Sequence, residues 1–212
     1  MSHPAQPSIS CPSCGAAHDV VNPGIVMFVC TYCGNAVSWD EEKIQAAGTQ
    51  AVLPEGFTRL YRGATGSLKD RRFEVLGRVR YSFGRGFWDE WYLELQDGRT
   101  VWLTEDNHEL AMQGQINDVQ VAPFDQYQPG TSLLVRDQLF WVQETGNAEC
   151  IGLEGDLPKL LTAGETYPYV DASSPDGRFT LGIEYDDEVP TVFWGRWLKH
   201  SALRLDDEGL DW

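Results

Sequence analysis

The chain has 212 residues, 32 of them acidic and 16 basic, which gives a formal net charge of -16 at pH 7. Affinity for nucleic acids and for anionic membranes depends largely on cationic residues, so this charge argues against both kinds of partner. The composition is 42% hydrophobic and 12% aromatic, enough to bury a core. No apolar run approaches the roughly twenty residues of a membrane helix, so we expect no membrane insertion.

The N-terminal residues 1–8 are rich in Pro and Ser and lack the apolar segment of a signal peptide. They predict a disordered lead-in. Together with cysteines spaced for a metal, they predict a cytoplasmic protein.

Two Cys-x-x-Cys-Gly motifs follow, at 11–15 and 30–34. Paired knuckles of this kind present four thiolates to one tetrahedral ion, and the Gly after each pair lets the backbone turn sharply. A disulfide framework would need an oxidising compartment, and redox chemistry would need only one pair. The pattern resembles the zinc ribbons and predicts one structural Zn²⁺ with four ligands: Cys11, Cys14, Cys30 and Cys33.

We place the ribbon at residues 9–40, with a strand over 24–29 and a return strand over 35–39. No Lys or Arg precedes Lys43, so a nucleic-acid contact by the ribbon is not expected. Segment 41–57 is predicted as a short helix that begins at Asp40 and stops at Gly48, followed by a linker. Such a linker leaves the ribbon free to move unless the ribbon docks.

Short β runs separated by Gly, Asp and Pro begin near residue 58. Residues 72–81 predict a strand with a bulge at Gly77. The dipeptide Asp97-Gly98 predicts a two-residue hairpin turn that pairs Gln96 with Arg99 and sets Leu93 opposite Trp102.

The same pattern of short β runs predicts further strands at 133–136, 139–144, 178–185 and 190–198. The expected fold is therefore mainly β, with a small four-cysteine zinc ribbon followed by a β-sandwich or barrel-like domain over 58–205. Two meander-type halves, about 58–125 and 130–205, build that domain, and 206–212 is an acidic tail.

Several short aromatic motifs resemble those of domain-of-unknown-function family 4178: Trp88–Leu93, Trp102-Leu103, Gly164–Pro168 and Trp194-Gly195. The resemblance covers roughly residues 58–205. It implies a bacterial β-rich domain, sometimes preceded by a zinc ribbon, with a link to membrane-stress systems. It implies no activity and no catalytic residue.

Motifs of common catalytic sites are missing from the sequence: there is no phosphate-binding loop, no nucleophile elbow and no zinc-protease helix. Cys150 lies in an apolar-alternating run, which indicates a buried and inert thiol. We therefore favour a non-catalytic adaptor in which the ribbon and the β-rich domain contact protein partners.

The alternative is a β-rich domain that binds a small ligand or acts as an enzyme, with the ribbon as an accessory. An acidic, aromatic pocket for a cationic ligand is predicted from four residues: Trp88, Glu90, Trp102 and Trp194. The simpler interpretation of Glu90 is an ion pair with Arg78 or Arg80 on a neighbouring strand.

Overall fold

A computed structural model describes residues 8–20, 22–39, 44–49, 53, 58–106, 109–185 and 188–207. The described chain is almost entirely β, with two three-residue 3₁₀ turns, η1 (Phe124–Gln126) and η2 (His200–Ala202). None of its helices is long and apolar enough to cross a bilayer. Residues 1–7 of the predicted lead-in, nearly all of the predicted linker and the last five residues of the predicted tail lie outside the described residues.

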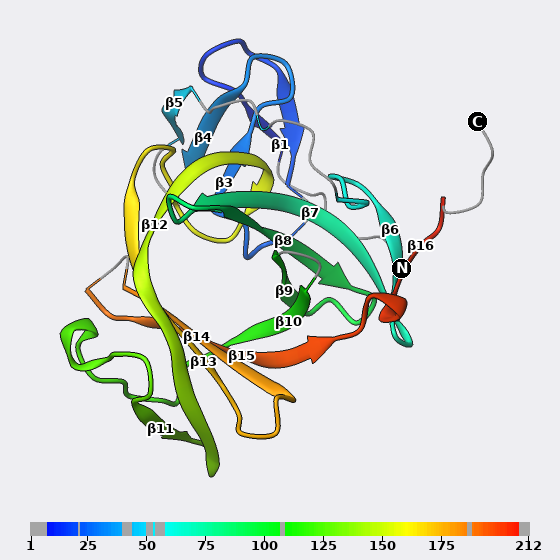
Figure 1. The fold of residues 1–212 in the computed structure, drawn as a ribbon. Helices are drawn as coiled ribbons and strands as arrows, with labels where there is room; N and C mark the ends of the chain where they lie inside the picture. Colours follow the sequence, from blue (N-terminus) through cyan, green and yellow to red (C-terminus); the bar gives the residue numbers. More distant parts are fainter. Residues whose placement is uncertain are drawn as a thin grey trace.

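Eight antiparallel strands form one closed sheet, in which the first strand pairs with the last (Figure 1). In spatial order these strands are β7 (Arg71–Ser82), β8 (Phe87–Leu95), β9 (Thr100–Asp106), β10 (Glu109–Ile116), β15 (Thr191–Leu198), β14 (Phe179–Glu184), β13 (Thr166–Ser173) and β12 (Gln138–Leu157). The pairing of β12 with β7 closes the ring. Closure leaves no free edge in an eight-stranded sheet.

Two meanders make up the closed sheet, β7 to β10 and β12 to β15, joined side by side where β10 meets β15. The predicted mainly-β fold with two meander-type halves is confirmed, and the halves share one ring. Three short strands flank it: β6 (Thr65–Leu68), β11 (Ser132–Val135) and β16 (Leu203–Leu205). Asp206, the first residue of the predicted tail, is tied to β6 and β7 through Thr65 and Arg72.

The predicted bulge in β7 is confirmed next to Gly77, since the pairing with β8 shifts between Val75 and Gly77. The predicted register of the β8–β9 hairpin is wrong by one residue. Tyr92 pairs with Trp102, and their rings lie 5.0 Å apart, whereas Leu93 pairs with Val101.

The reason for the shift is a three-residue turn over residues 96–98. The amide of Gly98 donates to the carbonyl of Leu95, and Gly98 has a φ of 79°. The turn thus ends with Gly98 in the left-handed conformation. Asp97 Oδ1 accepts a hydrogen bond from the Arg99 amide, which stabilises the turn. A one-residue slip moves every side chain to the other face, so Trp102 points inward and not toward Leu93.

The ribbon contains β1 (Ser8–Ser10), β2 (Ala17–Asp19), β3 (Met27–Val29), β4 (Asn35–Trp39) and β5 (Ile44–Thr49). The return strand predicted over 35–39 is confirmed as β4. The short helix predicted after it is wrong over 44–49, because this segment pairs with β4 as a strand. An isolated helix of nine residues is marginal in water, and pairing with an existing strand outweighs its local signals.

The ribbon docks on the closed sheet through a shared β ladder. Phe28 and Met27 of β3 pair with Asp156 and Leu157 at the end of β12, above the ring in Figure 1. One buried cluster runs from Ile9 and Phe28 in the ribbon to Tyr81 and Phe193 in the closed sheet. The ribbon and the closed sheet therefore share one core.

Two polar contacts fix the orientation of the ribbon. His18 stacks on Phe28 with ring centroids 3.9 Å apart, and its Nε2 lies 2.9 Å from Asp156 Oδ1. Asn22, 7% exposed, donates a hydrogen bond of 2.8 Å to Glu94 on β8. The interface thus combines apolar packing with directional contacts to both β8 and β12.

Closure of the sheet depends on a pair of facing glycines. Gly77 of β7 pairs with Gly155 of β12. A Cβ on Gly77 would meet the carbonyl oxygen of Asp156 at 2.3 Å, and a Cβ on Gly155 would meet that of Leu76 at 2.2 Å. Backbone atoms held in two ladders cannot move aside as a flexible side chain can.

We expect Gly77→Ala to lower the free energy of unfolding by more than about 3 kcal/mol, because the clash involves backbone at the closing pair. Gly98→Ala serves as the matched control. Its Cβ would meet nothing within 4 Å, so only the positive φ costs energy, about 1 kcal/mol. Urea denaturation of both variants checks this, and equal losses would contradict the role given to the glycine pair.

Candidate functional site: a four-cysteine cluster and an acidic cavity

The four predicted ligand cysteines lie together at the tip of the ribbon. Their Sγ atoms are all within 4.8 Å of one another, and two of the separations, Cys11 to Cys33 and Cys14 to Cys30, are 3.7 Å. A tetrahedron with metal–sulfur bonds of about 2.3 Å has edges of about 3.8 Å. The donor set therefore fits a tetrahedral metal ion.

Each knuckle has the backbone that such a site needs. The amides of Gly15 and Gly34 donate to the carbonyls of Cys11 and Cys30, both at 2.8 Å, and both glycines have positive φ, 77° and 71°. Asn35 Nδ2 lies 3.6 Å from Cys33 Sγ and donates to it. Hydrogen bonds of this kind orient sulfur ligands and stabilise their negative charge.

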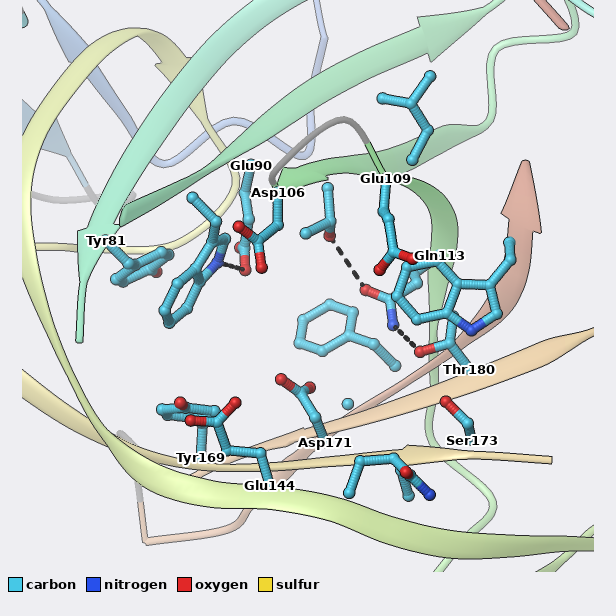
Figure 2. A pocket seen from close by; sticks show the side chains of 18 of the residues that line it. Tyr81, Glu90, Asp106, Glu109, Gln113, Glu144, Tyr169, Asp171, Ser173 and Thr180 are labelled. Carbon is cyan, nitrogen blue, oxygen red and sulfur yellow. Dashed lines mark hydrogen bonds between the residues drawn. The ribbon is translucent and has the colours of Figure 1, made fainter. Parts of the chain in front are cut away.

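A second candidate site is a cavity of about 870 Å³ inside the closed sheet (Figure 2). Closed eight-stranded sheets are wide enough to hold one small ligand. One part of its wall is aromatic. Trp88 contacts Tyr81 and Tyr169, with ring centroids 5.3 Å and 5.4 Å away, and Phe83 lies 5.9 Å from it.

Six carboxylate residues also line the cavity: Glu90 on β8, Asp106 on β9, Glu109 on β10, Glu144 on β12, Asp171 on β13 and Glu184 on β14. In Figure 2, Glu90, Asp106 and Glu109 project from one wall, and Glu144 and Asp171 project from the wall that faces it. Two basic residues, Lys199 and His200, also line the cavity, and both are exposed. The cavity is therefore strongly acidic.

The position of these groups raises the pKa of several of them. Burial, and then the charge of Glu184, raises the pKa of Glu90 to about 8, and Trp88 Nε1 donates to Glu90 at 2.9 Å. Burial, followed by the charges of Glu144 and Glu184, raises the pKa of Asp171 to about 7. Asp171 is enclosed by the sheet, yet solvent in the cavity reaches its side chain.

Asp106 shows the same effect. Its pKa is raised by burial and by the neighbouring carboxylates of Glu109 and Glu144. Its Oδ1 is shielded from solvent and has no hydrogen-bond partner in the part of the chain that the structure describes. Glu90 and Asp171 are therefore the two cavity carboxyl groups that titrate close to neutral pH.

The predicted pocket residues separate into two groups. Trp88 and Glu90 line the cavity. Trp102 lies on the inward face, but it packs on Tyr92 in the core shared with the ribbon and is not among the lining residues. Trp194 faces away from the cavity, with its ring 5.9 Å from that of Phe179, because its neighbour Phe193 takes the inward position.

The expected ion pair between Glu90 and Arg78 or Arg80 is wrong, because Asp89 is the partner of both arginines. Both arginines bind Asp89, each with two hydrogen bonds of 2.8–2.9 Å, and all three residues are buried. Arg80 pairs with Asp89 across the β7–β8 ladder, so these side chains share the outward face, whereas Glu90 points inward.

The other five carboxylates of the cavity were not predicted from the sequence. A signal for them exists in β13, where Tyr169, Asp171 and Ser173 alternate with the buried Val170 and Ala172. Such alternation ordinarily indicates a strand with a solvent-facing polar side. Here the polar side faces the cavity.

Cys150 is fully buried, and burial raises its pKa to about 11, so its thiol stays protonated. This agrees with the inert thiol expected from its apolar surroundings.

Comparison with known proteins gives one match: residues 62–200 match the family described as "Domain of unknown function (DUF4178)". The matched segment is well over half of the chain and contains every strand of the closed sheet. The chain belongs to the DUF4178 family. A search of the curated proteins and a search of the solved structures find no match. The acidic cavity thus lies within the DUF4178 segment, and the four-cysteine ribbon lies N-terminal to it.

We expect the free energy of unfolding in an amine-free buffer to fall as the pH rises from about 4.5 to about 8. Over this range unfolded Glu90 has lost its proton while folded Glu90 still holds one, because its pKa rises from 4.5 to about 8 on folding. Glu90→Gln stays neutral in both states, so this variant should gain stability relative to the original chain across that range.

Urea titrations at several pH values measure this difference. Glu149→Gln, an exposed site on β12 that does not line the cavity, is the control and should run parallel to the unsubstituted chain. Parallel curves for Glu90→Gln would contradict the raised pKa.

Proposed function

We propose that this DUF4178 protein binds a small organic cation in the cavity of its closed sheet. The observation that carries the proposal is the combination of six carboxylate residues with an aromatic wall in one cavity of about 870 Å³. Binding pockets of this size hold small ligands, and a few placed polar groups determine their orientation and specificity.

Burial and the repulsion of neighbouring carboxylates raise the pKa of Glu90, Asp106 and Asp171 in this cavity. A cation that enters the cavity relieves this repulsion, and the aromatic rings of Tyr81, Trp88 and Tyr169 offer their faces to it. Neutral and anionic molecules obtain neither benefit.

We also propose that the four cysteines hold one Zn²⁺. Four thiolates suit zinc, and a tetrahedral site with four protein ligands leaves no position for a substrate. The ion would thus be structural. By ordering the knuckles it would stabilise β3, whose pairing with β12 continues into the closed sheet.

Zinc removal provides one test. Metal analysis of the purified chain should give one Zn²⁺ per chain, and Cys14→Ser should reduce this content and lower the melting temperature by several degrees, because the metal contributes folding energy. Ser13→Ala is a control at an exposed, non-ligating position of the same knuckle. Full metal content in Cys14→Ser would contradict the ligand set.

Ligand binding is tested by thermal shift at pH 7.5 with choline, propylamine and 1,4-diaminobutane, and with 1,4-butanediol and butyrate as neutral and anionic controls. At a hundredfold excess over Kd a cation stabilises the native state by about 2.7 kcal/mol, which corresponds to a rise of several degrees. We expect cations alone to give this rise.

Glu90→Gln should weaken binding of the best cation about tenfold, as expected for the loss of one charge partner. Glu149→Gln makes the same side-chain replacement at an exposed position outside the cavity and should have no effect. If no cation raises the melting temperature, or if both variants bind alike, the proposal fails.

A role as an adaptor for protein partners is a second candidate. The β11–β12 hairpin projects at the lower left of Figure 1 and exposes three large apolar side chains: Leu134 (71% exposed), Leu139 (37%) and Trp141 (42%). Exposed apolar groups gathered on one hairpin are a feature of interaction sites. The adaptor role and the link to membrane-stress systems stay predictions.

A further inference from the structure

The distribution of charge in the cavity indicates how many cationic groups the ligand carries. The six carboxylates come from six strands, and Figure 2 shows five of them, all but Glu184, on two facing walls. A single ammonium group carries one positive charge, whereas six carboxylates and only two basic residues of the described chain line the cavity. A ligand that compensates the whole set must bring more than one charge.

Four of the six carboxylates lack a cationic partner. Asp106, Glu109, Glu144 and Asp171 form no ion pair with any basic residue of the described chain. Asp106 Oδ1 is in addition shielded from solvent and without a hydrogen-bond partner there. Solvent reaches Glu109, Glu144 and Asp171, so the shielded oxygen of Asp106 is the one polar atom of the four that ordinarily needs a partner.

An alkylammonium group of the chain pairs with one of the cavity carboxylates, although Lys159 itself does not line the cavity. Lys159, in the connection between β12 and β13, forms an ion pair with Glu184, and both side chains are largely buried, at 22% and 17% exposed. The charge of Lys159 also acts on Glu90, whose pKa it lowers against the larger effect of burial. One end of the acidic set is thus already occupied by an ammonium group on a hydrocarbon stem.

We propose that the ligand is an aliphatic polyamine whose ammonium groups span the facing carboxylate walls. This inference rests on the cation binding proposed above. The methylene chain between the ammonium groups would pack against Tyr81, Trp88 and Tyr169, and the ammonium groups would pair with Asp106, Glu144 and Asp171. Lys159 competes with the ligand for the Glu90–Glu184 end.

Isothermal titration calorimetry at fixed ionic strength tests the number of charges with four probes: propylamine, 1,4-diaminobutane, spermidine and spermine. Each added ammonium group is expected to tighten Kd about tenfold, since each gains a partly desolvated carboxylate partner. Mg²⁺ at the same concentration, a compact dication that cannot span the walls, should not compete.

Variants of the far wall separate specific binding from general attraction to an acidic protein. Asp171→Asn combined with Glu144→Gln should bring spermine affinity down at least tenfold while leaving propylamine unchanged. The control, Glu149→Gln combined with Glu74→Gln, makes the same change in net charge at exposed sites outside the cavity and should bind like the unsubstituted chain.

Lys159→Gln should tighten spermine binding about fivefold, because it removes the competing ammonium group. Lys159→Arg keeps the charge and should leave affinity unchanged.

The outcomes separate this inference from the function on which it rests. Affinity that does not rise with the number of ammonium groups, or that falls equally in the far-wall and control variants, overturns the polyamine assignment and leaves the binding of an organic cation standing. Absence of binding by all four amines overturns both.

Discussion

The pairing of β7 with β12 is the interaction on which the rest of the structure depends. It closes the eight-stranded sheet, and at its far end β12 continues into a ladder with β3 of the ribbon. Where the two pairings meet, Gly77 and Gly155 face each other, and the backbone approaches too closely for any Cβ. The 20-residue β12 therefore links the ring and the ribbon, and it presents Glu144 to the cavity.

The closed sheet and the ribbon contribute differently to the stability of the protein. A closed sheet with an acidic cavity loses stability through the burial of its carboxylates and the repulsion between them, which together raise the pKa of Glu90 and Asp171. The ribbon adds apolar core at the end of β12, through Met27 and Phe28 on one side and Leu157 and Leu161 on the other. Packing outside the cavity thus offsets part of this loss of stability.

Much of the fold could be predicted from the sequence, because its signals are local. The cysteine spacing predicted that the four cysteines lie together, and alternation with turn residues predicted the meanders. The predicted register of the hairpin at Asp97-Gly98 was wrong because the same dipeptide occurs in two-residue and in three-residue turns. The two turns differ in which residues of the flanking strands pair. The prediction of a helix at 44–49 was wrong because pairing with β4 determines the conformation of this segment. Local propensity carries no information about that pairing.

The cavity was only half predictable. Trp88 and Glu90 were found because they lie close together in an aromatic, acidic run. Asp106, Glu109, Glu144, Asp171 and Glu184 are spread over five strands, and only closure of the sheet brings them together. Along β13 the polar residues looked like a solvent-facing side, since alternation reports two faces but not which one encloses a space.

Because the pKa of Glu90 is raised to about 8 and that of Asp171 to about 7, both hold protons at neutral pH, and a bound cation is expected to displace them. Calorimetric titration of spermine at pH 7 in two buffers of different ionisation enthalpy measures this directly, because proton release makes the observed heat depend on the buffer. We predict net release of protons to the buffer on binding, reduced in Glu90→Gln and unchanged in Glu149→Gln. Binding with identical heats in both buffers would contradict the account.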